Sequence, residues 1–210
     1  MAALGILGGS FNPPHCAHLA CAEHALEALD LDLVALMPLG SPPHKAPGLD
    51  PGPEHRLAMC RLAVEGRDRM GVSELEINRG GTSYTVDTLR ALNESTPEDQ
   101  LTFIVGGDMA RTLPSWREPE VILELATLAV AERGTADRQA ITEALRELPG
   151  AQRTRFLDME AMAVSSSRIR DLVAAGEPID GLVAPEVADY IAAHGLYRVV
   201  MDADDTRAGA

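Results

Sequence analysis

The sequence predicts a single-domain α/β protein in which helices cover both faces of a parallel β-sheet. Short apolar runs alternate with amphipathic stretches along most of the 210 residues, and that alternation is typical of parallel strands joined by crossover helices. With 46% hydrophobic and 24% charged residues and no internal repeat, the composition suits one domain with a sizeable core. We therefore expect one domain over residues 1–200 and a disordered acidic tail over 201–210.

Each expected element has its own local signal. Strands are predicted where apolar runs are bounded by turn residues, at 4–7, 33–37, 70–77, 101–105, 128–131 and 155–159. Helices are predicted where apolar residues recur at helical spacing, at 19–29, 54–66, 85–92, 121–125, 135–148 and 185–194, with another after Ser165. Residues 38–53 are dense in Pro and Gly, so we expect a loop at the carboxyl end of a strand, where open α/β sheets bind ligands.

The charge and the cysteines narrow the classes of partner and compartment. A formal net charge of −14 argues against a nucleic-acid or anionic-membrane partner, since those need a basic surface. Cys16, Cys21 and Cys60 show no Cys-x-x-Cys pairing, which favours a reducing cytoplasm over a disulfide framework. The first apolar run is short and follows no charged region, so we expect no signal peptide or transmembrane helix.

The turn after the first expected strand is a candidate anion site. Gly8-Gly9-Ser10-Phe11 leads to His15 and His18. The glycines let backbone N–H groups approach a phosphate, the following helix adds its positive end, and both imidazoles can donate hydrogen bonds. Two histidines near a helix start are also common as solvated or capping groups. A zinc site that adds Cys21 and His24 is disfavoured, because three-residue spacing drifts around a helix.

Two later segments carry groups that suit a nucleotide. Ser165-Ser166-Ser167 stands at a helix start with Arg170 one turn later, and hydroxyls, unpaired N–H groups and a guanidinium together bind polyphosphate well. The alternative is a capping cluster with an exposed arginine. Asp108 follows two glycines at a strand end, where a carboxylate can accept hydrogen bonds from ribose hydroxyls. It could equally act as an N-cap.

A second ligand would need its own contacts, and three segments are candidates. Lys45 lies in the Pro-rich loop and could be a solvated charge or a phosphate ligand. The hydroxyls of Ser83-Tyr84-Thr85 can cap a helix. Trp116 is the single tryptophan in a chain with only 3% aromatic residues, so it could stack on a heteroaromatic ring or plug the edge of the sheet.

Read together, these strings resemble known motifs. Gly-Gly-Ser-Phe-Asn-Pro-Pro-His-x-x-His resembles the signature of the nucleotidyltransferase superfamily, which has glycine where this chain has Ala17. Val164-Ser-Ser-Ser-x-Ile-Arg170 is similar to its second signature, Ile-Ser-Ser-Thr-x-Ile-Arg. Ser83-Tyr84-Thr85 followed by Thr88-Leu89 resembles one branch, the nicotinate-nucleotide adenylyltransferases.

This resemblance implies a Rossmann-like nucleotidyltransferase fold and transfer of the adenylyl group of ATP to nicotinate mononucleotide, with release of pyrophosphate. It implies Mg²⁺ held mainly by substrate phosphates, with no protein metal ligand, and leaves a homo-oligomer open. The implied catalytic residues are His15, His18 and Arg170. The implied ATP ligands are Gly8, Gly9, Ser10, Phe11, Asp108, Ser166 and Ser167, and the implied mononucleotide ligands are Lys45, Ser83, Tyr84, Thr85 and Trp116.

Two other functions fit part of this pattern. A sister transferase acting on phosphopantetheine or a cytidylyl acceptor would keep the histidine and serine motifs, but it would not explain Ser83-Tyr84-Thr85 together with Trp116. A nucleotide-sensing module would bind without turnover. The presence of both histidines, Lys45 and Arg170 favours an enzyme over such a module.

Overall fold

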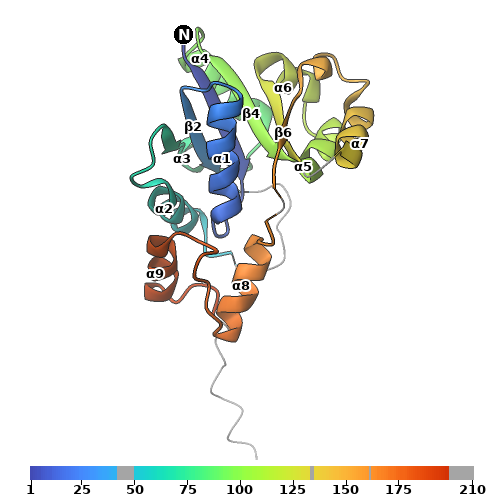
Figure 1. The fold of residues 1–210 in the computed structure, drawn as a ribbon. Coiled ribbons are helices and arrows are strands. Elements are labelled where there is room, and N and C mark those ends of the chain that lie inside the picture. Colours follow the sequence, from blue (N-terminus) through green and yellow to red (C-terminus); the bar gives the residue numbers. More distant parts are fainter. Residues whose placement is uncertain (42–49, 133–134, 161, 199–210) are drawn as a thin grey trace, which may run out of the picture.

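The computed structural model describes residues 1–41, 50–132, 135–160 and 162–198. Its centre is a parallel sheet with strand order β3-β2-β1-β4-β5-β6 (Figure 1). The strands are β1 (Ala3–Gly9), β2 (Leu33–Pro38), β3 (Met70–Val72), β4 (Gln100–Gly106), β5 (Thr127–Glu132) and β6 (Arg155–Asp158). The order reverses between β1 and β4, so the loops that leave these two strands diverge and open a crevice at their carboxyl ends.

Helices pack on both faces of the sheet, which confirms the predicted fold class. One core joins β1 and β2 to α1 (Cys16–Ala28), α2 (Pro53–Val64), α8 (Ser166–Ala175) and α9 (Pro185–Ala193). The other joins the opposite face to α4 (Thr85–Ser95), α5 (Gly107–Thr112), α6 (Pro119–Leu125) and α7 (Thr135–Leu145). Short turns of 3-10 helix, Leu113–Ser115 and Ala151–Arg153, precede α6 and β6. Because both faces are covered, the inner strands are nearly continuous apolar runs.

One expected element is wrong. Residues 70–77 do not form one strand: β3 ends at Val72, and α3 (Leu75–Arg79) follows. Only three residues of β3 pair with β2, and the Ser73 hydroxyl then accepts a hydrogen bond from the Leu75 N–H at 3.4 Å. Such local side-chain bonding favours a turn over a continued strand. The other expected strands and helices are present, with ends shifted by a few residues.

The C-terminal helices close back onto the start of the chain. Figure 1 shows α8 and α9 beyond the carboxyl edge of the sheet, where the Cys16 N–H donates to the Leu182 carbonyl at 2.9 Å. The Tyr197 hydroxyl donates to Asn12 Oδ1 at 2.7 Å. These contacts hold the turn after β1 against the C-terminal part of the chain. The predicted tail, 201–210, lies outside the described residues.

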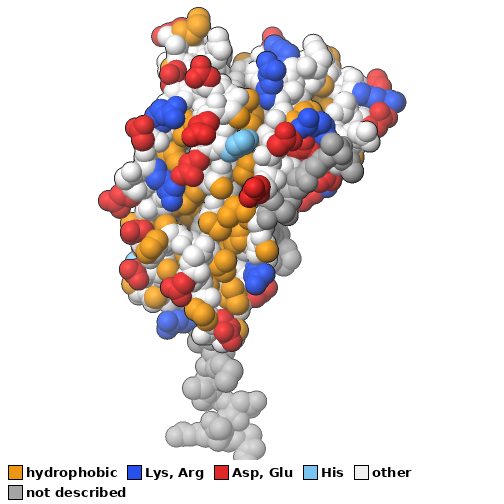
Figure 2. Space-filling model, viewed as in Figure 1, with side chains coloured by type: hydrophobic (Ala, Val, Ile, Leu, Met, Phe, Trp, Pro, Cys, Tyr) orange, Lys and Arg blue, Asp and Glu red, His pale blue; other side chains and the backbone are white. Residues whose placement is uncertain are grey.

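The surface carries mixed charge. On the face shown in Figure 2, hydrophobic side chains run down the middle between scattered acidic and basic groups. Within the described part of the chain, every helix is too short or too polar to cross a bilayer.

Candidate active site

A cavity of about 740 Å³ lies at the carboxyl ends of β1 and β4, the place where doubly wound sheets bind nucleotides. Many of the residues expected in the site line it: Gly8, Gly9, Ser10, His15, His18, Thr85, Asp108 and Trp116. Ala17, which stands where the superfamily signature has glycine, also lines it, so its methyl group borders the space a ligand would fill. The topology therefore brings residues far apart in the sequence to one opening.

The two histidines form a stacked pair at the start of α1. His15 is the N-cap residue, in extended conformation, and its ring lies 3.7 Å from the ring of His18, centroid to centroid. The His15 backbone N–H donates to His18 Nδ1 at 3.2 Å. Because Nδ1 accepts that bond, the proton of neutral His18 sits on Nε2, which is left as a hydrogen-bond donor.

Burial favours the neutral form of both imidazoles. It lowers the pKa of His15 to about 4, and burial together with the nearby His15 lowers the pKa of His18 to about 3. A neutral imidazole donates a hydrogen bond without adding charge. The histidine pair can therefore orient a ligand through hydrogen bonds. Positive charge at the site must come from arginine, lysine or a metal ion.

These shifts predict acid sensitivity. A histidine in the unfolded chain has a pKa near 6.5. Below that pH the unfolded chain binds protons that His15 and His18 do not bind in the folded protein, so the free energy of unfolding decreases as the pH falls towards 4. Between pH 7.5 and 5, His18 should account for a loss of up to about 2 kcal/mol of unfolding free energy. Urea denaturation at both pH values measures it. His18→Asn should reduce the loss, and His24→Asn, the matched change on the same helix, should leave it as in the wild type.

The turn beneath this pair depends on Phe11. Its side chain is fully buried, its φ is +48°, and its ring meets the edge of the His18 ring with centroids 4.9 Å apart. A bulky residue with positive φ is strained, so packing holds it there. Phe11 thus packs beneath the cavity wall, against Gly9 and His18. It is not among the residues that line the cavity.

The start of α8 is bonded to the same turn. The Ser165 hydroxyl caps the helix by accepting from the Arg168 N–H at 3.2 Å, so the alternative role of this cluster, helix capping, holds for Ser165. The Ser166 hydroxyl donates to the Pro13 carbonyl at 2.9 Å. Arg170 donates to the Asn12 carbonyl at 2.8 Å and to the Ser167 hydroxyl at 3.1 Å. Ser166 and Arg170 therefore bond to the turn before His15, and Ser167 bonds to Arg170; none of the three is among the residues that line the cavity.

The sequence motifs imply ATP as a substrate, and on that expectation Arg170→Lys should lower kcat/KM for ATP about tenfold although net charge is unchanged. The planar fork of Arg170 serves the Asn12 carbonyl and the Ser167 hydroxyl at once, and an ammonium group cannot reproduce that geometry. Steady-state kinetics with ATP as the varied substrate test this. The control is Arg168→Lys on the exposed side of α8. Equal kcat/KM values for Arg170→Lys and the wild type would remove Arg170 from the site.

On the other side of the cavity, α4 begins at Thr85 with Tyr84 as its N-cap residue. The expected capping by a side-chain hydroxyl is wrong here: the Ser83 hydroxyl instead accepts from the Gly40 N–H at 3.1 Å, because the loop after β2 packs against this segment. The first N–H groups of a helix have no intrahelical partner. Thr85, the first residue of this helix, lines the cavity. The centre of the Tyr84 ring lies 5.0 Å from the Arg117 guanidinium carbon.

Asp108 and Trp116 line the cavity from the side of β4. Asp108 is inside α5, whose N-cap residue is Gly106, so the N-cap alternative is wrong; its exposed carboxylate pairs with Arg111. The Trp116 indole is half-buried, donates to the Thr112 hydroxyl at 3.0 Å and touches Phe103 edge to face. Lys45 lies outside the described residues.

Three buried charged residues of the described ranges were not predicted from the sequence: Arg56, Glu76 and Glu132, the last of which lines the cavity and pairs with Arg138. Arg56 is 2% exposed and bonds to loops on both sides of the site; its place on the same helical face as Met59, Cys60 and Ala63 was an available signal. Glu76 is 2% exposed, lines the cavity and accepts from the Thr88 hydroxyl at 2.9 Å. Glu76 was not predicted because residues 70–77 were expected to form one strand.

The chain is similar to known proteins over most of its length. Residues 6–172 match the cytidylyltransferase-like family. A relative from Synechococcus sp. (strain JA-3-3Ab), named "Probable nicotinate-nucleotide adenylyltransferase", is 41% identical over 196 residues, covering 92% of this chain and 94% of that protein. A relative of the same name from Bordetella avium is 42% identical over 200 residues, covering 94% and 99%.

Solved structures share the fold. The nicotinic acid mononucleotide adenylyltransferase of Plasmodium falciparum, solved in complex with NaAD, superposes with a TM-score of 0.77 at 20% identity, covering 94% of this chain and 98% of that one. The sequence relatives and the family match together place the protein: the chain belongs to the cytidylyltransferase-like family and, within it, to the nicotinate-nucleotide adenylyltransferases.

Proposed function

We propose that this protein transfers the adenylyl group of ATP to nicotinate mononucleotide, forming nicotinate adenine dinucleotide and pyrophosphate in NAD biosynthesis. The observation that carries the proposal is the stacked pair of His15 and His18 at the wall of a cavity at the β1/β4 switch point. The names of the 41% and 42% identical relatives support the same reaction, as do the folds of structures described as complexed with NaAD and with APC.

The chemistry needs positioning more than proton transfer. A nucleotide phosphate is already ionised at neutral pH, so it can attack the α-phosphorus of ATP in line without a general base. The bond from the α-phosphorus to the bridging oxygen then breaks, and pyrophosphate leaves with that electron pair. The groups that this requires are donors to the phosphate oxygens. We assign that role to His18 Nε2, to His15 and to Arg170.

The remaining assignments follow the sequence motifs, since Asp108 and Trp116 both line the cavity from the side of β4. On the ATP side we assign Gly8, Gly9 and Ser10 to the phosphates, Ser166 and Ser167 to the β and γ phosphates and Asp108 to the ribose, with Phe11 supporting the turn. On the mononucleotide side we assign Trp116 to the pyridine ring and Ser83, Tyr84 and Thr85 to its carboxylate. Lys45 is assigned to the mononucleotide phosphate from the sequence motif alone.

We infer that a divalent cation, Mg²⁺ by preference, acts with the substrates. Within the four described ranges, no three His, Cys, Asp or Glu side chains lie together as metal ligands, and Mg²⁺ commonly binds through substrate phosphates and water. The cavity suits that arrangement, because its histidines are neutral donors and do not repel a cation. When bound, the ion would neutralise phosphate charge.

The three thiols, Cys16, Cys21 and Cys60, are free. This state suits a reducing compartment, and we infer that the enzyme works in the cytoplasm.

Product analysis tests the proposal directly. The protein is incubated with ATP, Mg²⁺ and, separately, nicotinate mononucleotide, nicotinamide mononucleotide, phosphopantetheine and a cytidylyl acceptor with CTP, and products are resolved by chromatography. Nicotinate adenine dinucleotide and pyrophosphate in equal amounts are expected. Product only with another acceptor would show a sister transferase, and nucleotide binding without product would show a sensing module.

A further inference from the structure

Arg56 connects the two loops that border the cavity. It lies in the first turn of α2, and only 2% of its surface is exposed. Its Nη1 donates to the Ser10 carbonyl at 3.0 Å, its Nη2 to the Gly40 carbonyl at 3.0 Å, and its Nε to Asp50 Oδ1 at 3.2 Å. A guanidinium has a rigid fork of donors, so one side chain fixes the spacing of three chain segments.

The two carbonyls belong to opposite sides of the proposed reaction. Ser10 lies in the glycine turn assigned to ATP. Gly40 follows β2 and touches the mononucleotide side: its N–H donates to the Ser83 hydroxyl, and a Cβ at Gly40 would lie 2.6 Å from the Glu76 carbonyl oxygen. Among the described residues, the last backbone hydrogen bond between these two loops runs from the Leu39 N–H to the Gly9 carbonyl at 3.0 Å. Beyond that point, Arg56 bridges them.

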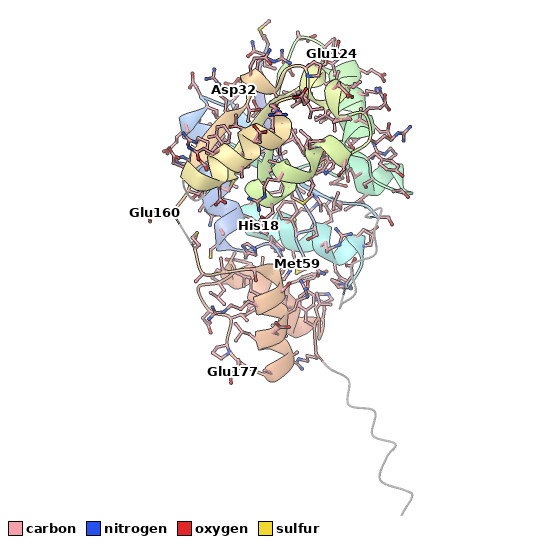
Figure 3. The ribbon with its side chains drawn as sticks, turned by 90° about the vertical axis from the view of Figure 1, so that its right-hand side faces the viewer. His18, Asp32, Met59, Glu124, Glu160 and Glu177 are labelled. Atoms are coloured by element: carbon pink, nitrogen blue, oxygen red, sulfur yellow. The ribbon has the colours of Figure 1, made fainter. Side chains whose placement is uncertain are left out.

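We propose that Arg56 is a positioning residue that sets the distance between bound ATP and bound nicotinate mononucleotide. This inference rests on the proposed function. Arg56 is absent from the cavity lining, so it acts through the Ser10 and Gly40 backbones. Figure 3 labels His18 of α1 and, below it and nearer α8, Met59 of α2, the helix that also carries Arg56. An in-line transfer is sensitive to small errors in the relative placement of its reactants. Loss of the Arg56 bridge would therefore slow the transfer, while each substrate would keep the contacts by which it binds.

The test separates binding from turnover. Arg56→Ala and Arg56→Lys are compared with the wild type and with Arg61→Ala, a control on the same helix whose exposed side chain pairs with Glu74. Calorimetry measures the Kd of each substrate alone, and product formation measures kcat. For Arg56→Ala we expect kcat to fall roughly 30-fold while each Kd stays within about threefold. Arg61→Ala should match the wild type in both.

Chemical rescue and the lysine variant complete the test. Millimolar guanidinium should restore part of kcat in Arg56→Ala and leave the wild type and Arg61→Ala unchanged. Arg56→Lys, which keeps the charge and loses the fork, should be folded by thermal melting and slower than the wild type.

A normal kcat in both Arg56 variants would overturn the proposal, as would a fall in kcat matched by an equal rise in both Kd values. Failure of both variants to fold would also overturn it, because Arg56 would then serve stability. An inactive wild type would instead refute the proposed function.

Discussion

His18→Ala should lower kcat by two or more orders of magnitude while the protein stays folded. The side chain lines the cavity, and the bond from the His15 N–H holds its Nδ1, so Nε2–H is aimed by the fold before any ligand binds. In a preorganised site one such donor to transition-state charge is typically worth ~3–4 kcal/mol. Steady-state kinetics, with thermal melting to confirm the fold, measure the effect.

The matched control for this change is His24→Ala, which removes an imidazole from the same helix outside the cavity lining. Its kcat should equal that of the wild type. His18→Asn provides a second comparison, because its amide oxygen can still accept from the His15 N–H while its amino group sits differently. A folded His18→Ala protein with near-normal kcat would remove His18 from the catalytic list.

The second large effect concerns the pyridine nucleotide. We expect kcat/KM for nicotinate mononucleotide to exceed that for nicotinamide mononucleotide by roughly two orders of magnitude, because two charge-assisted hydrogen bonds are lost with the amide, each worth ~1.5–3 kcal/mol. The donors are the first N–H groups of α4 at Thr85, where the helix dipole also favours an anion. Kinetics with both acceptors at fixed ATP measure the ratio.

The start of α4 offers a sharp test of this mechanism. Thr85→Pro removes one N–H donor, and proline fits the first position of a helix; the preceding Tyr84 is already extended, with φ −115° and ψ 129°, as a residue before proline requires. The preference for the acid should fall about tenfold, the equivalent of ~1.4 kcal/mol. Thr85→Ala keeps the N–H and should keep the preference. Equal kcat/KM values of the wild type for both mononucleotides would refute selection of the acid. The proposal of adenylyl transfer would not be affected.

Much of the fold was predictable because its signals are local. The glycine turn between an apolar strand and an amphipathic helix, the serine cap at Ser165 and the alternation of strands with helices each depend on neighbours in the chain. The strand expected at 70–77 is wrong, because β3 is an edge strand with only three paired residues. With so few pairs, local bonding such as that from the Leu75 N–H to the Ser73 hydroxyl favours a turn after Val72.

The fold class and the family could be predicted from the sequence, as could a set of polar and glycine residues at the cavity wall, because motifs record which groups the chemistry needs; most of the other residues that line the cavity belong to no motif. The protonation state of those groups and the contacts that hold them depend on tertiary packing. Burial, a property of packing, makes His15 and His18 neutral. Contacts between distant segments aim Arg170 at Asn12, turn Ser83 towards Gly40 and place Arg56 between two loops. No local pattern encodes such long-range bonds, since they exist only once the chain has folded.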